Sequence, residues 1–233
     1  MNNPKILIIT TSANQMDNGE PTGVWLEELT TPYYAFLDNG ADVTLASITG
    51  GAVPIDQRSV SKDRENDASV ERYLKDPVAK DAAQNTKPFT TYKPEDFDAV
   101  FLPGGHGTMF DYPTSKELAS LIETFDQQGK IISAVCHGPA ALVSAKTSTG
   151  SPIVKGRKVA SFTDSEEVAV GLDQAVPFLL ESRLRELGAD HQSTSNFQSF
   201  AIRDRNLVTG QNPASATETA TLVMEAVRET VTA

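Results

Sequence analysis

The chain has 233 residues, of which 39% are hydrophobic and 22% charged, an ordinary composition for one globular domain. Its formal net charge of −11 argues against nucleic acid and anionic membranes as partners, because both repel an acidic protein. No apolar run approaches the roughly 20 residues that span a bilayer, and the N-terminus lacks a signal-peptide pattern. Together with a single cysteine, which suits a reducing compartment, these features lead us to expect a cytoplasmic protein without a membrane segment.

Alternating strand and helix patterns run along most of the chain. The continuous β-branched run at 5–11 predicts a strand buried on both faces. Apolar residues at helical spacing between 115 and 128, followed by Gly129, predict an amphipathic helix with a glycine C-cap. The other expected elements are, in chain order, a helix at 25–39, a strand at 42–47, one or two short helices within 69–84, strands at 98–102 and 130–135, a helix from Gly138, a strand at 158–162, a helix at 176–187, a strand at 206–209 and a helix at 213–231.

This alternation with short connections predicts an α/β fold. We expect one domain over 1–233, built as a doubly wound, mostly parallel sheet with helices on both faces. The polar segment 50–94 interrupts the rhythm and is interpreted as an inserted excursion. It is either a small cap over the functional site or a surface insertion with no role.

The sequence Ala134-Val-Cys-His-Gly-Pro139 places the lone cysteine where a buried strand turns into a helix. Such a turn exposes its side chain, and amides at the helix start favour an anion, so we expect a lowered pKa for the Cys136 thiol. The amide of His137 can face a developing oxyanion. The alternative for an isolated cysteine is a small buried apolar side chain, but this strand-to-helix context favours a nucleophile.

A second unusual turn, Pro103-Gly-Gly-His-Gly-Thr108, directly follows another strand. Its glycines allow backbone N–H groups to approach a ligand, so Gly105, His106 and Gly107 are expected to line an oxyanion or substrate site. Neither of the phosphate-binding glycine patterns is present. Two of the chain's three histidines fall in these two turns. We expect no metal site, because Cys136 and His137 are sequence neighbours that diverge at a turn.

These motifs resemble the ThiJ/PfpI superfamily, which shares the flavodoxin-like fold of class I glutamine amidotransferases. Within it, the chain is similar to the branch of small heat-shock chaperones that act as glutathione-independent glyoxalases, also called glyoxalase III or D-lactate dehydratase. The resemblance extends over nearly the whole chain. It is carried by TGV at 22–24, GHGT at 105–108, FDYP at 110–113, AVCHGP at 134–139, FTD at 162–164 and VTGQNPASA at 208–216, together with Glu28, Pro32 and Glu167.

The resemblance implies a role for each matched site residue. Cys136 corresponds to the nucleophile, and His137 to its base partner, oriented by the carboxylate of Glu167. Glu28 corresponds to a helix carboxylic acid that exchanges a proton with the thiol or the substrate. The amides of Gly105 and His137 correspond to an oxyanion hole. A thiol beside an imidazole with an acidic orienter is also the usual arrangement of an activated nucleophile.

The leading functional hypothesis from the sequence is conversion of methylglyoxal, or a similar small 2-oxoaldehyde, to a 2-hydroxy acid. The reaction would pass through a cysteine hemithioacetal and require no cofactor, and the resemblance suggests a homodimer. One alternative is a cysteine hydrolase, either a peptidase or a deglycase. The other is a holdase chaperone or redox sensor, which would need an exposed apolar patch or an accessible low-pKa thiol.

Overall fold

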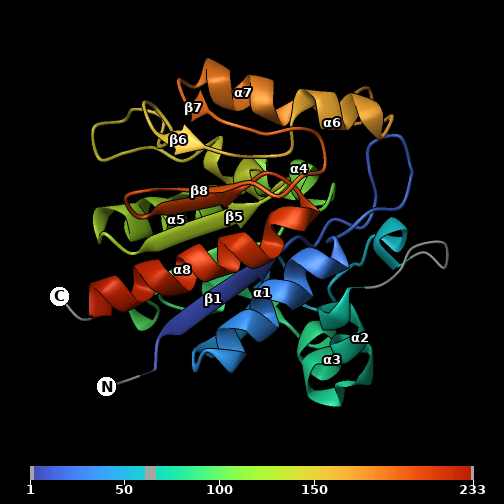
Figure 1. The fold of residues 1–233 in the computed structure, drawn as a ribbon, viewed down its shortest axis with the longest axis vertical. Coiled ribbons are helices and arrows are strands. Elements are labelled where there is room, and N and C mark those ends of the chain that lie inside the picture. The colour runs from blue at the N-terminus through green and yellow to red at the C-terminus, as the bar shows by residue number, and fades with distance from the viewer. Residues whose placement is uncertain (1–2, 61–66, 232–233) are drawn as a thin grey trace.

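The computed structural model describes residues 3–60 and 67–231, which fold around one central sheet (Figure 1). Within these residues the sheet has seven strands in the order β3-β2-β1-β4-β5-β9-β8, and only the β8–β9 pair is antiparallel. The strands are β1 (Lys5–Thr10), β2 (Asp42–Ser47), β3 (Lys87–Pro88), β4 (Ala99–Leu102), β5 (Ile131–Val135), β8 (Ala201–Asp204) and β9 (Leu207–Gly210). The predicted mostly parallel sheet is therefore confirmed.

Helices cover both faces of this sheet, as the doubly wound fold requires. On one face α1 (Leu26–Asp38) packs against α8 (Ala216–Val231), and Figure 1 shows both in front of the strands. On the other face lies α5 (Lys116–Gln127), whose first turn is capped by the Ser115 hydroxyl. The remaining helices are α2 (Ala68–Lys75), α3 (Pro77–Gln84), α4 (Thr108–Asp111), α6 (Asp164–Ala169) and α7 (Leu180–Glu186).

The core is divided by the sheet into two apolar layers. Leu7 and Ile9 of β1 belong to the layer that contains the α5 side chains. Ile6 and Ile8 belong to the layer that contains side chains of α1 and α8. Successive side chains of a strand point to opposite faces, so a strand with helices on both sides must be apolar at every position. This explains the uninterrupted apolar run at the start of the chain.

The two unusual turns lie next to each other at the carboxyl edge of the sheet. β4 and β5 are parallel neighbours, and Leu102, the last residue of β4, pairs with Ala134. The glycine-rich turn and the cysteine turn therefore leave the sheet side by side, although about 30 residues separate them in sequence. The Thr108 hydroxyl, which contacts the carbonyl oxygens of both Gly105 (2.9 Å) and His137 (3.1 Å), holds the two turns together.

Three predicted elements differ from the observed ones. The strand expected at 158–162 is reduced to β6 (Lys158–Val159), which pairs with β7 (Asp190–His191) in a separate two-stranded sheet. Beyond β6, the amide of Ala160 donates to the Thr209 hydroxyl and that of Phe162 to the Cys136 carbonyl, so the ladder ends.

The helix expected at 176–187 begins only at Leu180, because Leu179 has an extended backbone (φ −76°, ψ 122°), and the amide of Val176 donates instead to the Leu172 carbonyl in a separate turn. The helix expected from Gly138 is a short 3-10 segment, Gly138–Leu142, closed by hydrogen bonds between residues three apart.

The segment 50–94 contains the two short helices expected between 69 and 84. They are α2 and α3, whose first turns are capped by the side chains of Asp67 and Asp76. Residues 61–66 lie outside the described part of the chain. That 50–94 forms a cap remains a prediction. None of the helices that the structure describes combines the length and the apolar character needed to cross a membrane.

Candidate active site

Cys136 occupies a strained turn directly after β5. Its amide donates to the Gly210 carbonyl of β9 at 2.9 Å, so the residue is tied to the sheet edge. Its φ of 58° lies in the left-handed region, which costs a non-glycine residue roughly 1–2 kcal/mol. Strain of this kind persists where the surrounding structure imposes it. The result agrees with the sharp turn predicted from the sequence, and it places the sulfur on the wall of a pocket.

His137 and Glu167 complete a hydrogen-bonded series with this thiol. His137 Nδ1 lies 3.2 Å from Cys136 Sγ, and His137 Nε2 lies 2.7 Å from Glu167 Oε2. Glu167 is brought there by α6, which begins at a capping box between Thr163 and Glu166. All three members of the series are buried. The structure thus brings together the nucleophile, base and orienter suggested by the sequence.

Glu28 approaches the thiol from a second helix. It projects from the first turn of α1, is fully buried, and accepts the Gly104 amide on Oε2 at 2.9 Å. Its carboxyl also hydrogen-bonds the Cys136 side chain. Two carboxylates from different helices, Glu28 and Glu167, therefore act on one cysteine, the first directly and the second through His137.

The expected lowering of the thiol pKa is wrong. Burial, followed by the nearby negative charge of Glu28, raises the pKa of Cys136 well above its usual value. The acids of α6 add to the effect in the same direction. The segment after the cysteine is a short 3-10 turn rather than a full α-helix, so its dipole is too small to compensate. The thiol therefore needs a proton acceptor at the moment of reaction.

Glu167 serves two imidazoles rather than one. His106 Nε2 lies 2.7 Å from Glu167 Oε1, and the His106 and His137 ring centroids are 4.1 Å apart. Burial alone would raise the pKa of Glu167, but His137 and the hydrogen bonds from both rings outweigh it and lower that pKa. The sequence assigned His106 to an oxyanion or substrate site. The structure directs its Nε2 at the carboxylate while the ring also lines the pocket beside Cys136, and two histidines in adjacent turns were the available signal.

Two residues of the polar segment 50–94 extend this series, and no motif in the sequence pointed to either. Arg58 reaches the pocket wall, where its Nη2 lies 3.4 Å from His106 Nδ1. It is held by Asp56, whose carboxylate accepts Arg58 Nε at 2.9 Å and Nη2 at 2.5 Å. The Asp56 side chain is only 1% exposed, whereas that of Arg58 is 40% exposed, so the buried carboxylate anchors a guanidinium that reaches in from the surface.

The proposed oxyanion groups fall into two classes. Among the described residues, the amides of Gly105 and His137 donate to no other residue. Gly105 has φ of +100°, and a Cβ there would lie 2.4 Å from the Gly23 carbonyl oxygen, so only glycine fits. The Gly107 amide, in contrast, donates to that Gly23 carbonyl at 3.3 Å. Gly107 therefore supports the turn rather than facing the pocket with a free N–H.

The pocket above the thiol is a small, mainly apolar cavity of about 260 Å³. Around the Cys136 sulfur it combines the two imidazoles with the Arg58 guanidinium. Its other walls are aromatic or aliphatic, so a bound molecule would be largely removed from water. The full lining comprises Trp25, Arg58, Gly105, His106, Cys136, His137, Phe162, Val170, Phe197 and Pro213.

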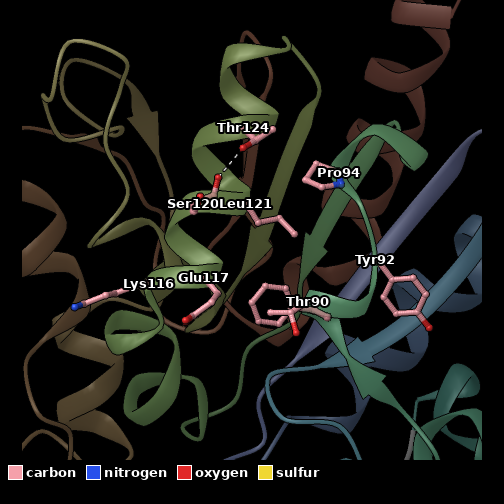
Figure 2. A pocket seen from close by; sticks show the side chains of 9 residues that line it. Thr90, Tyr92, Pro94, Lys116, Glu117, Ser120, Leu121 and Thr124 are labelled. Atoms are coloured by element: carbon pink, nitrogen blue, oxygen red, sulfur yellow. Dashed lines mark hydrogen bonds between the residues drawn. The ribbon is translucent and has the colours of Figure 1, made fainter.

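A larger hollow of about 400 Å³ lies against α5, away from the cysteine (Figure 2). Figure 2 shows side chains of α5 on one side of it and of the segment before β4 on the other. Its lining contains hydroxyl, amine and carboxyl groups on a surface helix. The lining residues are Phe89, Thr90, Tyr92, Pro94, Lys116, Glu117, Ser120, Leu121 and Thr124.

The two imidazoles and their carboxylate also have the composition of a metal site. One ligand atom each from His106, His137 and Glu167 lies within 4.8 Å of the others, a spacing that a divalent cation could bridge. As arranged, both imidazole Nε2 atoms face the carboxylate at 2.7 Å, so a cation would have to displace both hydrogen bonds. The hydrogen-bonded arrangement is sufficient to orient the histidines. The absence of a metal remains a prediction from the sequence.

Comparison with known proteins gives consistent results over nearly the full length. The model of the DJ-1/PfpI family matches residues 21–226. A Candida albicans protein named Glyoxalase 3 is 34% identical, covering 95% of this chain and 98% of that protein. A Saccharomyces cerevisiae protein named Glutathione-independent glyoxalase HSP31 is 32% identical, covering 96% and 98%. The X-ray structure of the Francisella tularensis Rapid Encystment Protein 24 KDa superposes with a TM-score of 0.92 at 36% identity, covering 96% and 99%.

Proposed function

The chain belongs to the DJ-1/PfpI family, and from that premise we propose that it is a glutathione-independent glyoxalase. Its substrate would be methylglyoxal or a related 2-oxoaldehyde, and its product the corresponding 2-hydroxy acid. The observation that carries the proposal is the environment of one sulfur: Cys136 Sγ faces His137 Nδ1 at 3.2 Å, is hydrogen-bonded by Glu28, and borders a small pocket. An aldehyde carbon placed there would meet a nucleophile and two proton carriers.

The first step is formation of a hemithioacetal. The thiol transfers its proton to His137 Nδ1 as the sulfur attacks the aldehyde carbon, so the S–C bond forms while the carbonyl π bond becomes an alkoxide. The amides of Gly105 and His137 would stabilise that alkoxide, which then takes up a proton. Because the pKa of the thiol is raised, proton transfer and attack occur together rather than from a standing thiolate.

The second step moves a hydrogen within the substrate. Glu28 removes the proton from the carbon bonded to sulfur, and the electron pair flows to the neighbouring ketone to give an enediolate. Return of a proton to the second carbon yields a thioester of the 2-hydroxy acid. The aldehyde carbon is oxidised and the ketone carbon reduced by the same amount, so no external oxidant or reductant is needed. Water then hydrolyses the thioester and regenerates the Cys136 thiol.

The proposal has finer features, each with its own support. The reaction is a cysteine-dependent, cofactor-independent lyase reaction, since the chain's own groups move every proton. A nucleophile that must stay reduced fits a cytoplasmic location. A homodimer is retained from the family resemblance, and sedimentation velocity would test it. The alternatives fit less well: a redox sensor requires an exposed, low-pKa thiol, and a peptidase requires a cleft open to an extended chain.

The direct test is lactate formation from methylglyoxal by the purified protein in buffer without glutathione or any other thiol. Wild type should form D-lactate, whereas Cys136→Ala should be inactive. Lys116→Gln, in the hollow against α5, is the matched control: it is purified in the same way and should keep wild-type activity. No lactate from wild type, or equal turnover by Cys136→Ala, would refute the proposal.

A further inference from the structure

His106 makes two polar contacts of opposite kind, and together they fix the position of its proton. Its Nδ1 lies 3.4 Å from Arg58 Nη2, and a guanidinium group can only donate. Nδ1 must therefore accept. A neutral imidazole carries one proton, which then resides on Nε2, 2.7 Å from Glu167 Oε1. His106 thus donates to the carboxylate.

The protonation of His106 agrees with this arrangement. Burial, with the adjacent His137 ring as the second cause, lowers the pKa of His106 to about 4. The ring is neutral at physiological pH, so its Nε2–H is a constant donor rather than one that appears on acidification. Arg58 cannot turn away freely, because two of its nitrogens are bound to the buried carboxylate of Asp56.

Each oxygen of Glu167 consequently receives one imidazole nitrogen at the same 2.7 Å distance. If the His106 hydrogen bond were lost, a buried carboxylate oxygen would have no partner and the group could rotate. Leaving such an oxygen unsatisfied is costly, because a buried carboxylate oxygen cannot turn to water for a replacement hydrogen bond. Rotation would also release His137 Nε2, and with it the alignment of Nδ1 on the Cys136 sulfur.

We propose that His106, locked by Arg58, is a positioning residue for the glyoxalase reaction. Its Nε2–H holds the Glu167 carboxylate in the orientation that keeps His137 Nδ1 pointed at the thiol. The catalytic role rests on the proposed function, but the hydrogen bonds from His106 to Glu167 and from Glu167 to His137 are present without a substrate. The pair Asp56–Arg58 is then a remote support for the nucleophile, supplied by the segment 50–94.

Nitrogen NMR of histidine-labelled protein tests the proton position directly. Wild-type His106, identified by the loss of its signals in His106→Leu, should show a non-protonated Nδ1 and a protonated Nε2. Arg58→Met should leave the proton on Nε2, because the Glu167 carboxylate can only accept, but it should shift the Nδ1 resonance to that of a nitrogen without a donor. Arg58→Lys, which restores a donor, should return the wild-type Nδ1 resonance. A protonated Nδ1 in wild type would overturn the proposal.

Alkylation of the single cysteine by iodoacetamide tests the consequence without using an aldehyde. His106→Leu should slow alkylation at pH 7.5 by about tenfold, the equivalent of one buried hydrogen bond, and move its pH midpoint upward. His106→Gln, whose amide can still donate to Glu167, should recover most of the rate, and thermal unfolding midpoints would identify misfolded variants. Unchanged alkylation in folded His106→Leu would refute the positioning role. If the variants change the alkylation rate as expected but wild type does not turn over methylglyoxal, only the glyoxalase function is refuted.

A separate observation concerns the part of the pocket wall formed by Phe197. This residue has φ of 61°, a left-handed conformation that is unfavourable for a bulky side chain. Its amide donates to Glu166 Oε1 at 2.7 Å, and the same oxygen accepts Asn212 Nδ2 at 2.8 Å. Glu166 is fully buried, so this strained backbone is held from the protein interior. The strained backbone holds the Phe197 side chain in the pocket wall, although the residue is 45% exposed.

This ring belongs to an apolar wall with more surface than the methyl group of methylglyoxal could contact. The Phe197 and Phe162 ring centroids are 6.3 Å apart, and Val170 and Pro213 complete the wall. The cavity volume of about 260 Å³ equals the liquid volume of roughly eight to nine water molecules. We infer that the pocket accepts 2-oxoaldehydes with an aromatic or branched apolar substituent in preference to methylglyoxal, an inference that again rests on the proposed function.

The substrate ratio tests this inference. Wild type should show a higher kcat/KM for phenylglyoxal than for methylglyoxal, and Phe197→Asn should lower that ratio roughly tenfold, within the range for lost apolar contacts. Asparagine tolerates the left-handed conformation, so the variant should fold at least as well as wild type. An unchanged ratio would refute the inference. If neither aldehyde reacts, tighter binding of mandelate than lactate to Cys136→Ala, reduced by Phe197→Asn, would support the apolar subsite independently.

Discussion

The pocket at Cys136 and the hollow against α5 differ in what surrounds them more than in size. The α5 hollow is the larger, about 400 Å³ against about 260 Å³, and its polar groups stand on a surface helix. Three titratable groups that border the cysteine pocket, Cys136, His106 and His137, are buried, and the buried carboxylate of Glu167 orients both imidazoles. Removal from water strengthens such interactions and shifts pKa values, whereas surface groups stay near their usual behaviour. The comparison teaches that burial and fixed partners, rather than volume, indicate where chemistry occurs.

The largest expected effect is on the buried side of this comparison, at Glu28. Glu28→Gln should lower kcat on methylglyoxal by a factor of roughly 10² to 10⁴, the usual contribution of a general acid–base group. Its thiol should nevertheless alkylate at lower pH, because the second cause of the raised Cys136 pKa, the charge of Glu28, is gone. Steady-state kinetics and iodoacetamide rates across pH 6–10 measure the two effects. Loss of both activity and alkylation would show instead that the variant has misfolded.

The next effect concerns the close packing of the glycine-rich turn. Gly105→Ala should reduce the free energy of unfolding by about 2–4 kcal/mol, because the new Cβ would meet the Gly23 carbonyl in addition to a positive φ. Gly129→Ala is the matched control: it also has a positive φ, but nothing lies within 4 Å of the position that a Cβ would take, so about 1 kcal/mol is expected. Urea denaturation measures both. Equal losses would mean that backbone conformation, and not packing, makes glycine necessary at 105.

A third effect concerns how the free energy of unfolding depends on pH. It involves Asp111, the last residue of α4. Burial raises its pKa to about 6, although the Thr11 hydroxyl and the Ser12 amide contact one carboxylate oxygen. Since the folded-state pKa exceeds the unfolded value, this group's stabilisation is greatest below the unfolded pKa of 3.8 and is lost as pH rises through about 6. The wild-type free energy of unfolding minus that of Asp111→Asn should therefore increase on acidification from pH 7 to 4.

The size of that difference is at most about 3 kcal/mol, from a shift of about two pKa units. His106 acts in the opposite sense, because its lowered pKa makes acid destabilising, but it is present in both proteins and cancels in the difference. Urea denaturation at several pH values provides the measurement. A difference independent of pH would show that folding does not shift the pKa of Asp111.

The smallest effect is expected in the hollow against α5. Lys116→Gln changes an exposed side chain at the first residue of that helix. The free energy of unfolding should stay within about 0.5 kcal/mol of wild type, and kcat/KM on methylglyoxal should not change. A marked loss of activity would contradict the contrast drawn between the two cavities and assign a role to the larger one.

Much of the fold could be predicted because its signals are local. The apolar run at 5–11 corresponds to β1 (Lys5–Thr10), and the helix expected at 115–128 to α5 (Lys116–Gln127). Predictions failed where a local preference met a competing partner. The strand expected at 158–162 stops at Val159, because the Ala160 amide bonds a hydroxyl from β9 rather than a neighbouring strand. Such a contact leaves no periodic trace in the sequence.

For the site, the sequence by itself determined which groups were available: a lone cysteine at a strand end, a histidine beside it, and acids matched by family resemblance at 28 and 167. Only the tertiary structure decided how they act on each other. It joined His106 to Glu167 and added Arg58 from a segment without a recognisable motif. It also reversed the expected direction of the Cys136 pKa. The reason is physical: charge interactions depend on burial and on distances through space, and neither is encoded in the spacing of residues along the chain.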